Sequence, residues 1–100
     1  MYDRYLKEEN SLVKGFSLAQ NIPNPFNETT TIVAEIPQNV SEAKIVIYNL
    51  QGIELQSYPL RERGRTTVQI KGGSLVSGMY LYALLADGQL IDTKKMILTK

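Results

Sequence analysis

Acid–base chemistry in this chain would have to come from its carboxylates. The 100 residues contain no His and no Cys, which excludes a Ser-His-Asp triad, a thiol nucleophile, a disulfide and a Cys/His zinc site. No two of the scattered carboxylates have the flanking sequence expected of a glycosidase pair: Glu28, Glu35, Glu42, Glu54, Glu62, Asp87 and Asp92. We therefore expect a protein that is not an enzyme and that binds no cofactor or metal.

Arginines form the first basic group. Arg61, Arg63 and Arg65 lie at alternate positions. Glu62 and Gly64 separate them, so part of the charge is neutralised and a turn is favoured. The pattern is typical of a solvated loop, and a contact with phosphate or lipopolysaccharide is the second hypothesis.

Lysines form the second basic group. Lys94, Lys95 and Lys100 bracket an apolar Met-Ile-Leu triplet at residues 96–98. One interpretation is an edge strand whose charges prevent aggregation. The other is a terminal tail that a receptor recognises.

Residues 21–27 read Asn-Ile-Pro-Asn-Pro-Phe-Asn. Proline fixes φ and pushes the residue before it toward extended conformations. Pro23 and Pro25, with Asn24 between them, therefore predict a stiff, extended connector that Phe26 anchors in the core. The connector is either a rigid turn between two strands or a surface for peptide recognition.

The length of 100 residues and the composition predict one globular domain. The chain is 43% hydrophobic and 21% charged. Its net charge of +1 produces no electrostatic field that would attract nucleic acid or an anionic membrane. Residues 75–86, the longest uncharged apolar-rich stretch, are too few for the ~20 residues that span a bilayer. We expect neither nucleic-acid binding nor stable membrane insertion.

From residue 16 onward, apolar and polar residues alternate with period two in short runs separated by turn residues. The Asp87-Gly88 pair indicates a tight hairpin. Seven strands are predicted, at residues 16–20, 30–36, 43–49, 53–58, 65–71, 79–86 and 89–99. This spacing is typical of an all-β, seven-stranded, immunoglobulin-like antiparallel β-sandwich.

The alternation also predicts the core. The sixth strand is apolar on both faces, which favours a central position. The expected core residues are Ile32, Ile45, Ile47, Leu55, Val68, Ile70, Leu81 and either Leu84 or Leu85.

The N-terminal residues follow a different period. Residues 2–13 place apolar side chains at helical spacing, so we expect a short amphipathic helix that stops near Gly15. Residues 1–15 are then a helical leader or the remnant of an upstream region, and residues 16–100 form the sandwich. The first fourteen residues lack the apolar run of a signal peptide, which favours a piece of a longer protein.

The order of the motifs resembles the C-terminal sorting domain of the type IX (Por) secretion system of Gram-negative bacteria. Its elements are the Asn-Pro segment, a hairpin after a Tyr-Asn pair, a Ser-Gly-Met-Tyr strand start and the basic end of the chain. The matching residues are Leu18, Gln20, Asn21, Pro23, Asn24, Pro25, Phe26, Asn27, Thr29 or Thr30, Ile32, Ile47, Tyr48, Asn49, Gly52, Leu75, Ser77, Gly78, Tyr80, Tyr82, Lys95, Met96 and Lys100.

The resemblance implies a non-catalytic secretion signal that follows an attached N-terminal cargo protein. Such a domain folds in the periplasm and is recognised by the outer-membrane translocon. A sortase-like peptidase then acts, and the cargo reaches the cell surface or is secreted. The residues expected at the translocon are Pro23, Asn24, Pro25, Phe26, Gly78, Tyr80, Lys94, Lys95 and Lys100. The alternative is an immunoglobulin-like surface module that binds carbohydrate or protein, which requires an aromatic platform or a concave pocket.

Overall fold

A computed structural model describes residues 14–100. The helix predicted at residues 2–13 lies outside the described residues. The described part contains seven strands and no helix, so the predicted number of strands is confirmed. They are β1 (Ser17–Leu18), β2 (Thr29–Ile36), β3 (Ala43–Tyr48), β4 (Glu54–Leu60), β5 (Gly64–Lys71), β6 (Gly78–Ala86) and β7 (Gln89–Leu98).

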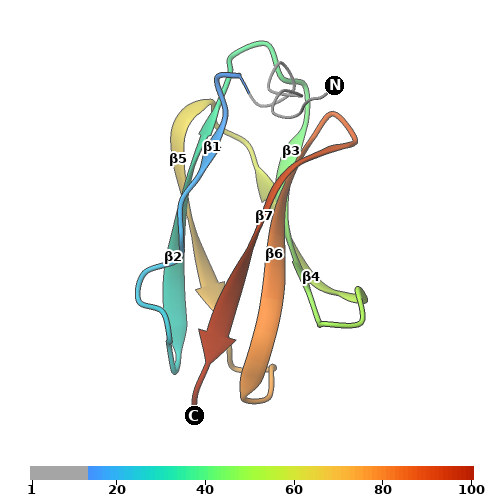
Figure 1. The fold of residues 1–100 in the computed structure, drawn as a ribbon. Coiled ribbons are helices and arrows are strands. Elements are labelled where there is room, and N and C mark those ends of the chain that lie inside the picture. Colours follow the sequence, from blue (N-terminus) through green and yellow to red (C-terminus); the bar gives the residue numbers. More distant parts are fainter. Residues whose placement is uncertain (1–13) are drawn as a thin grey trace, which may run out of the picture.

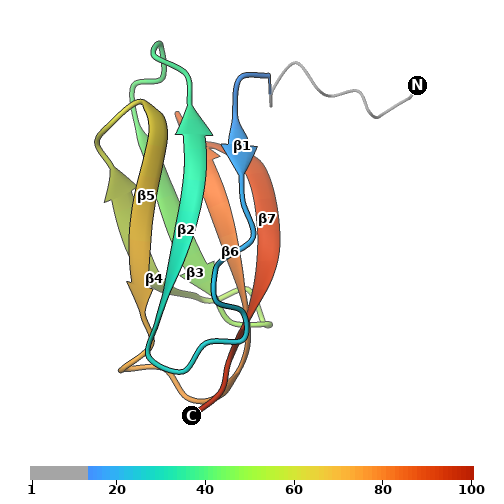
Figure 2. The same cartoon turned by 90° about the vertical axis from the view of Figure 1, so that its left-hand side faces the viewer.

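The strands form two facing sheets, as Figure 1 shows from the side. One sheet has the order β1-β2-β5 and the other the order β4-β3-β6-β7. Every pairing within them is antiparallel. Figure 2 looks onto the three-stranded sheet. The predicted antiparallel sandwich is confirmed, and β6 has the central position expected from its apolar sequence.

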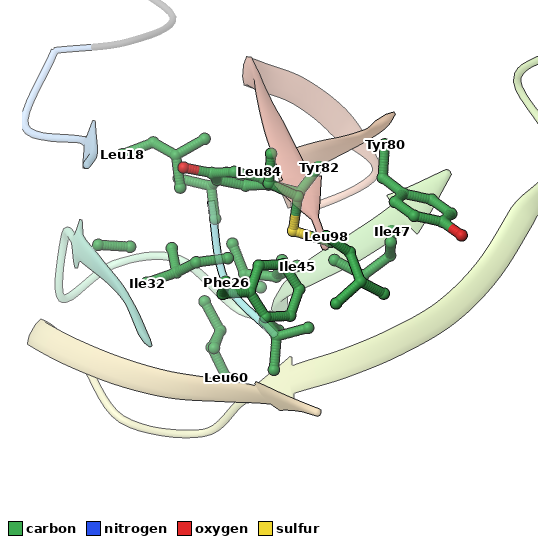
Figure 3. Close-up of a cluster of buried hydrophobic side chains, with 14 of the residues drawn as sticks. Leu18, Phe26, Ile32, Ile45, Ile47, Leu60, Tyr80, Tyr82, Leu84 and Leu98 are labelled. Atoms are coloured by element: carbon green, nitrogen blue, oxygen red, sulfur yellow. The ribbon is translucent and has the colours of Figure 1, made fainter. Parts of the chain in front are cut away.

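The core lies between the sheets because alternate residues of each strand point inward. Figure 3 shows part of this cluster. Five predicted residues have no exposed surface: Ile32, Ile45, Ile47, Ile70 and Leu84. Val68 is half-buried and packs against the cluster.

The prediction of Leu81 as a core residue is wrong. Tyr80, Tyr82 and Leu84 are the β6 residues that join the core cluster. Period two therefore places Leu81 and Leu85 on the other side of β6, where both are half-buried.

The prediction of Leu55 is also wrong, since 39% of this residue is exposed. The pairing of β3 with β4 changes register between Ile47 and Tyr48 and leaves Leu55 without a partner. A one-residue shift exchanges the faces of a strand. Gln56, opposite Ile47, and Leu60 consequently take the inward positions on β4.

The hairpin between β6 and β7 confirms the prediction from its Asp-Gly pair. Asp87 has φ 51° and Gly88 has φ 79°, as a type I′ turn requires. The Asp87 carboxylate accepts the backbone N–H groups of Ser41 at 3.0 Å and Glu42 at 2.9 Å. The turn is thereby fixed to the connection between β2 and β3.

Candidate functional site

Three segments that are distant in sequence meet at the end of the sandwich where the C-terminus lies (Figure 1). We call residues 20–27, 72–80 and 95–100 the terminal cluster. At its centre, Phe26 forms a parallel bridge with Leu98. The Phe26 N–H donates to the Ile97 carbonyl at 2.9 Å, and the Thr99 N–H donates to the Phe26 carbonyl at 2.8 Å.

Two side chains extend this contact along the outer edge of β7. Gln20 Nε2 donates to the Lys95 carbonyl at 2.6 Å. Asn24 Oδ1 accepts the N–H of Ile97 at 2.9 Å. An edge strand presents unpaired backbone groups that invite further pairing. Residues 20–27 satisfy such groups on the C-terminal half of β7.

A buried polar network gives the Asn-Pro segment its shape. Asn21 is 1% exposed, and its Nδ2 donates to Thr30 Oγ1 at 3.0 Å and to the Pro23 carbonyl at 3.1 Å. The Thr30 hydroxyl donates to the same carbonyl at 2.7 Å. These bonds close a loop, so the segment bends at residues 23–25 and the predicted extended connector is wrong. The predicted anchor is confirmed, because Phe26 is buried in the core.

Residues 72–80 complete the terminal cluster. A Cβ atom on Gly72 would lie 3.1 Å from side-chain carbons of both Leu98 and Phe26, so close packing requires glycine here. Lys100 Nζ donates to the Leu75 carbonyl at 2.6 Å and to the Gly73 carbonyl at 3.3 Å. The end of the chain is therefore fixed to the connection between β5 and β6.

Most of the residues predicted at the translocon lie in the terminal cluster, in two different roles. Phe26 and Tyr80 are buried anchors, and the Tyr80 hydroxyl donates to the Val76 carbonyl. The exposed residues are Pro23, Asn24, Pro25, Gly78, Lys95 and Lys100. Lys94 is half-buried and precedes the cluster on β7. Gln20 and Asn21 were not predicted as site residues, although both belong to the motif that carried the resemblance.

The arginine group lies elsewhere. Arg63 Nε donates to the Val40 carbonyl at 2.9 Å, and its other nitrogens donate to the carbonyls of Ser41 and Leu60 at 2.9 and 3.1 Å. The guanidinium thus connects two loops, while Arg61 and Arg65 are exposed. The structure favours the loop interpretation for Arg63.

One phenol is held away from water. Tyr82 has no exposed surface, and its hydroxyl donates to the Ala19 carbonyl at 2.7 Å. Burial raises the pKa of Tyr82 to about 12. The Asp92 charge adds to the rise, and a backbone hydrogen bond from Asn21 opposes it. A neutral phenol with this partner joins β6 to the segment after β1.

The described residues show no arrangement that would hold a metal ion. Among residues 14–100, no three His, Cys, Asp or Glu residues are grouped closely enough for that purpose. Within the same range, no helix has the length and apolar character needed to cross a membrane. The terminal cluster itself contains side chains that cap the backbone of β7, exposed amide and ammonium groups and buried apolar anchors.

The comparisons with solved structures concern the fold. The structure described as "Biofilm associated protein - BSP domain" has a TM-score of 0.59 and 9% identity, over 83% of this chain and 15% of that chain. An alkylpurine DNA glycosylase of Pseudomonas fluorescens bound to DNA with an abasic-site analogue gives a TM-score of 0.43 and 10% identity, over 86% and 31%. The chain therefore spans a minor part of both proteins. The comparison with curated proteins found no match.

The fold and the terminal cluster define an all-β sandwich domain whose motif residues gather at one end. The family model described as "Secretion system C-terminal sorting domain" matches residues 21–99. The chain belongs to this family, which is the sorting domain of the type IX secretion system and is not a catalytic family. Membership implies a C-terminal secretion signal and export to the cell surface or secretion.

Proposed function

We propose that the domain directs an attached N-terminal cargo protein across the outer membrane, and that the translocon recognises the terminal cluster. In this proposal the cargo passes through the periplasm, a sortase-like peptidase acts on it, and it reaches the surface or is secreted. The observation that carries the proposal is the convergence of three motif segments at one end of the sandwich.

The same convergence makes the proposed signal conformational. Asn24 and Ile97 are bonded although 73 residues separate them, and Lys100 bonds to a carbonyl 25 residues away. Exposed Pro23 and Lys95 therefore acquire their relative positions only in the folded sandwich. The buried rings of Phe26 and Tyr80 hold these positions from inside.

We further infer that the sandwich is immunoglobulin-like and spans residues 16–100, with residues 1–15 as leader or upstream remnant. The sheets β1-β2-β5 and β4-β3-β6-β7 correspond in order to strands A-B-E and C′-C-F-G of that fold. The BSP-domain structure supports a shared fold at 9% identity.

The test is a reporter with its own signal peptide, fused ahead of the domain in a bacterium that has a type IX exporter. Lys94 and Lys95 are both changed to Glu. A receptor that reads their charge is repelled, so exported reporter falls by about tenfold or more while reporter accumulates in the periplasm. Lys100 is left unchanged, because its ammonium group holds the Leu75 and Gly73 carbonyls.

The matched control reverses two exposed lysines, Lys14 and Lys71, and changes the net charge equally. We expect parental export from it, since neither lysine is among the residues expected at the translocon. Circular dichroism establishes that each variant is folded. A folded Lys94→Glu/Lys95→Glu variant exported at the parental rate would rule out these lysines as the signal.

A further inference from the structure

The two sheets end in four edge strands, β1, β5, β4 and β7. An unprotected edge presents backbone N–H and C=O groups that pair readily with a strand of another chain. The β7 edge is protected, because the side chains of Gln20 and Asn24 and the backbone of Phe26 bind its backbone at residues 95–97. The β1 edge is protected by its length of only two residues.

The β4 edge is protected by its own sequence. The hydrogen bonds of Ile97 show that its backbone groups face outward from β7. Alternation from β7 through β6 and β3 then places the backbone groups of Ser57 and Pro59 on the outer side of β4. Proline has no N–H for an added strand, and the register shift beside Tyr48 interrupts the ladder. Both features keep edge strands from pairing.

The β5 edge also turns backbone groups outward, on the free side of the three-stranded sheet (Figure 2). The backbone of Thr31 is hydrogen-bonded on the β1 side of β2. Because neighbouring residues alternate, the backbone of Ile32 faces β5 and bonds to its partner Val68. The N–H and C=O groups of Thr67 and Gln69 therefore point away from β2.

None of the three protections is found on β5. The strand has eight residues, contains no proline, and pairs with β2 without a register shift. Within residues 14–100, no second strand pairs with it, and the side chain that reaches its outer edge is Gln56, whose Nε2 lies 3.5 Å from the Lys71 carbonyl. Most of this edge is therefore open to a partner.

The fold has room for a further strand beside β5. The sheets correspond in order to A-B-E and C′-C-F-G of the immunoglobulin fold, and variable-type domains carry a strand D beside E while C′ stays beside C. Val68 on β5 and Tyr58 on β4 are half-buried residues that pack against the core cluster. An inward side chain of an added strand would therefore meet apolar surface at this side of the sandwich.

The charges along β5 indicate the chemistry of the partner strand. Arg65 and Lys71 are exposed, and β5 has no acidic residue. Glu35, opposite Arg65, is the acidic residue in the paired lengths of β2 and β5. Directly opposed like charges destabilise a sheet, and opposite charges stabilise it. Two copies of β5 paired over their full length would place Arg65 of each copy opposite Lys71 of the other, so an acidic strand fits this edge better than a second copy.

We propose that the outer edge of β5 accepts an extended segment of another protein as an antiparallel strand. The segment carries acidic side chains opposite Arg65 and Lys71 and an apolar side chain opposite Val68. Its backbone pairs with the N–H and C=O groups of Thr67 and Gln69, so backbone bonds supply affinity and the opposed side chains supply specificity. The inference does not depend on the sorting function, because this edge lies outside the terminal cluster.

The test uses the full chain and an acetylated, amidated peptide of sequence Asp-Val-Thr-Val-Thr-Val-Asp, whose acidic ends can lie opposite Arg65 and Lys71. Saturating peptide should slow amide hydrogen exchange at Thr67 and Gln69 by about tenfold, because both N–H groups gain acceptors. The same peptide with Lys in place of both Asp residues should bind about tenfold more weakly. Unchanged exchange at residues 67–69, or protection confined to β4 or β7, would overturn the inference.

A proline substitution tests the edge itself. Thr67→Pro removes an outward N–H that makes no bond to β2, a position where edge strands tolerate proline. The folded variant should bind the acidic peptide about tenfold more weakly. The matched control is Ser57→Pro, which removes an outward N–H from the β4 edge and should bind as the parent does. Equal binding by both folded variants would contradict the assignment of the site to β5.

A charge exchange tests specificity without changing the backbone. Arg65→Glu and Lys71→Glu are combined, and both side chains are exposed, so the fold should be retained. The folded variant should prefer the lysine peptide to the acidic peptide by about tenfold. An unchanged preference for the acidic peptide would refute the proposed charge pairing. Sedimentation showing a parental dimer that Thr67→Pro abolishes would also refute the proposal, because the edge then binds a second copy.

Discussion

The two sheets turn different outer faces away from a shared core. On the three-stranded sheet, the outward residues of β5 are polar or charged, as Thr67 and Lys71 illustrate. On the four-stranded sheet, the outward residues of the central strand β6 are Met79, Leu81, Ala83 and Leu85, and Leu90 on β7 lies opposite Leu85. We call these five residues the apolar outer face, which Lys44 and Lys95 border. Both sheets cover the same core cluster, so core packing does not dictate the difference. The solvent side of an antiparallel sheet normally carries polar residues, so the three-stranded sheet follows this rule on β5 and the four-stranded sheet departs from it on β6.

The largest expected effect on stability comes from shortening a core side chain, and it gives a scale for substitutions on the two outer faces. Ile47 and Val46 are adjacent, fully buried and on opposite sides of β3. Ile47→Ala should lower the free energy of unfolding by about 2–5 kcal/mol. Val46→Ala removes two buried carbons outside the core and should cost about 1–2 kcal/mol. Thr67→Ala, on the polar face, should stay within about 0.5 kcal/mol. Urea unfolding measures all three, and equal costs at positions 46 and 47 would contradict the assignment of the two sides.

The pH dependence of stability tests the inner side of β6, which lies opposite the apolar outer face and carries Tyr82. Because burial raises the pKa of Tyr82 to about 12 from 10.0, the unfolded chain releases a proton that the folded domain retains. Stability from this group is complete below pH 10 and is lost as the pH rises toward 12. The loss should be about 1–3 kcal/mol, measured by urea unfolding at a series of pH values. Tyr82→Phe is the control, and a decline of the same size in that variant would show that Tyr82 is not its cause.

The smallest effect on stability is expected at the apolar outer face itself. Met79→Ser and Leu90→Ser change exposed side chains, so the free energy of unfolding should move by less than about 0.5 kcal/mol each. Fluorescence of an apolar dye bound to the native domain should nevertheless decrease, because part of the exposed apolar surface is removed. Undiminished dye binding would mean that the dye, and the apolar patch it reports, lies elsewhere.

Alternation was sufficient to predict the fold because it reports which side of a strand is buried. Ile32, Ile45 and Ile70 were found in this way. Leu55 was not, because the register shift beside Tyr48 arises from pairing between strands and leaves no local signal. For Leu81 the signal itself was ambiguous, since β6 is apolar on both sides.

The sequence was sufficient to predict which segments belong to the site, but not the contacts between those segments. The Asn-Pro motif pointed to residues 21–27, and the lysines pointed to the last strand. The side chains of Gln20 and Asn24 bind the backbone of β7, 75 and 73 residues later in the chain. These contacts exist only when the two sheets pack together, so no local sequence pattern indicates them. Arg63 illustrates the same limit: the alternation of three arginines indicated a surface group, but the Arg63 guanidinium also donates to the carbonyls of Val40 and Ser41, 23 and 22 residues earlier in the chain.

The bridge between Phe26 and Leu98 has a consequence for the order of folding. The two residues are separated by most of the described chain, and contacts of such high sequence separation form slowly because closing the long loop between them costs chain entropy. During synthesis, Phe26 has no partner until residues 97–99 have been made. A chain that stops earlier leaves the backbone of Phe26 unpaired beside an incomplete sandwich. The terminal cluster can therefore assemble only after β7 has been synthesised, and an exporter that bound this cluster would select chains that contain β7 over chains that stop before it.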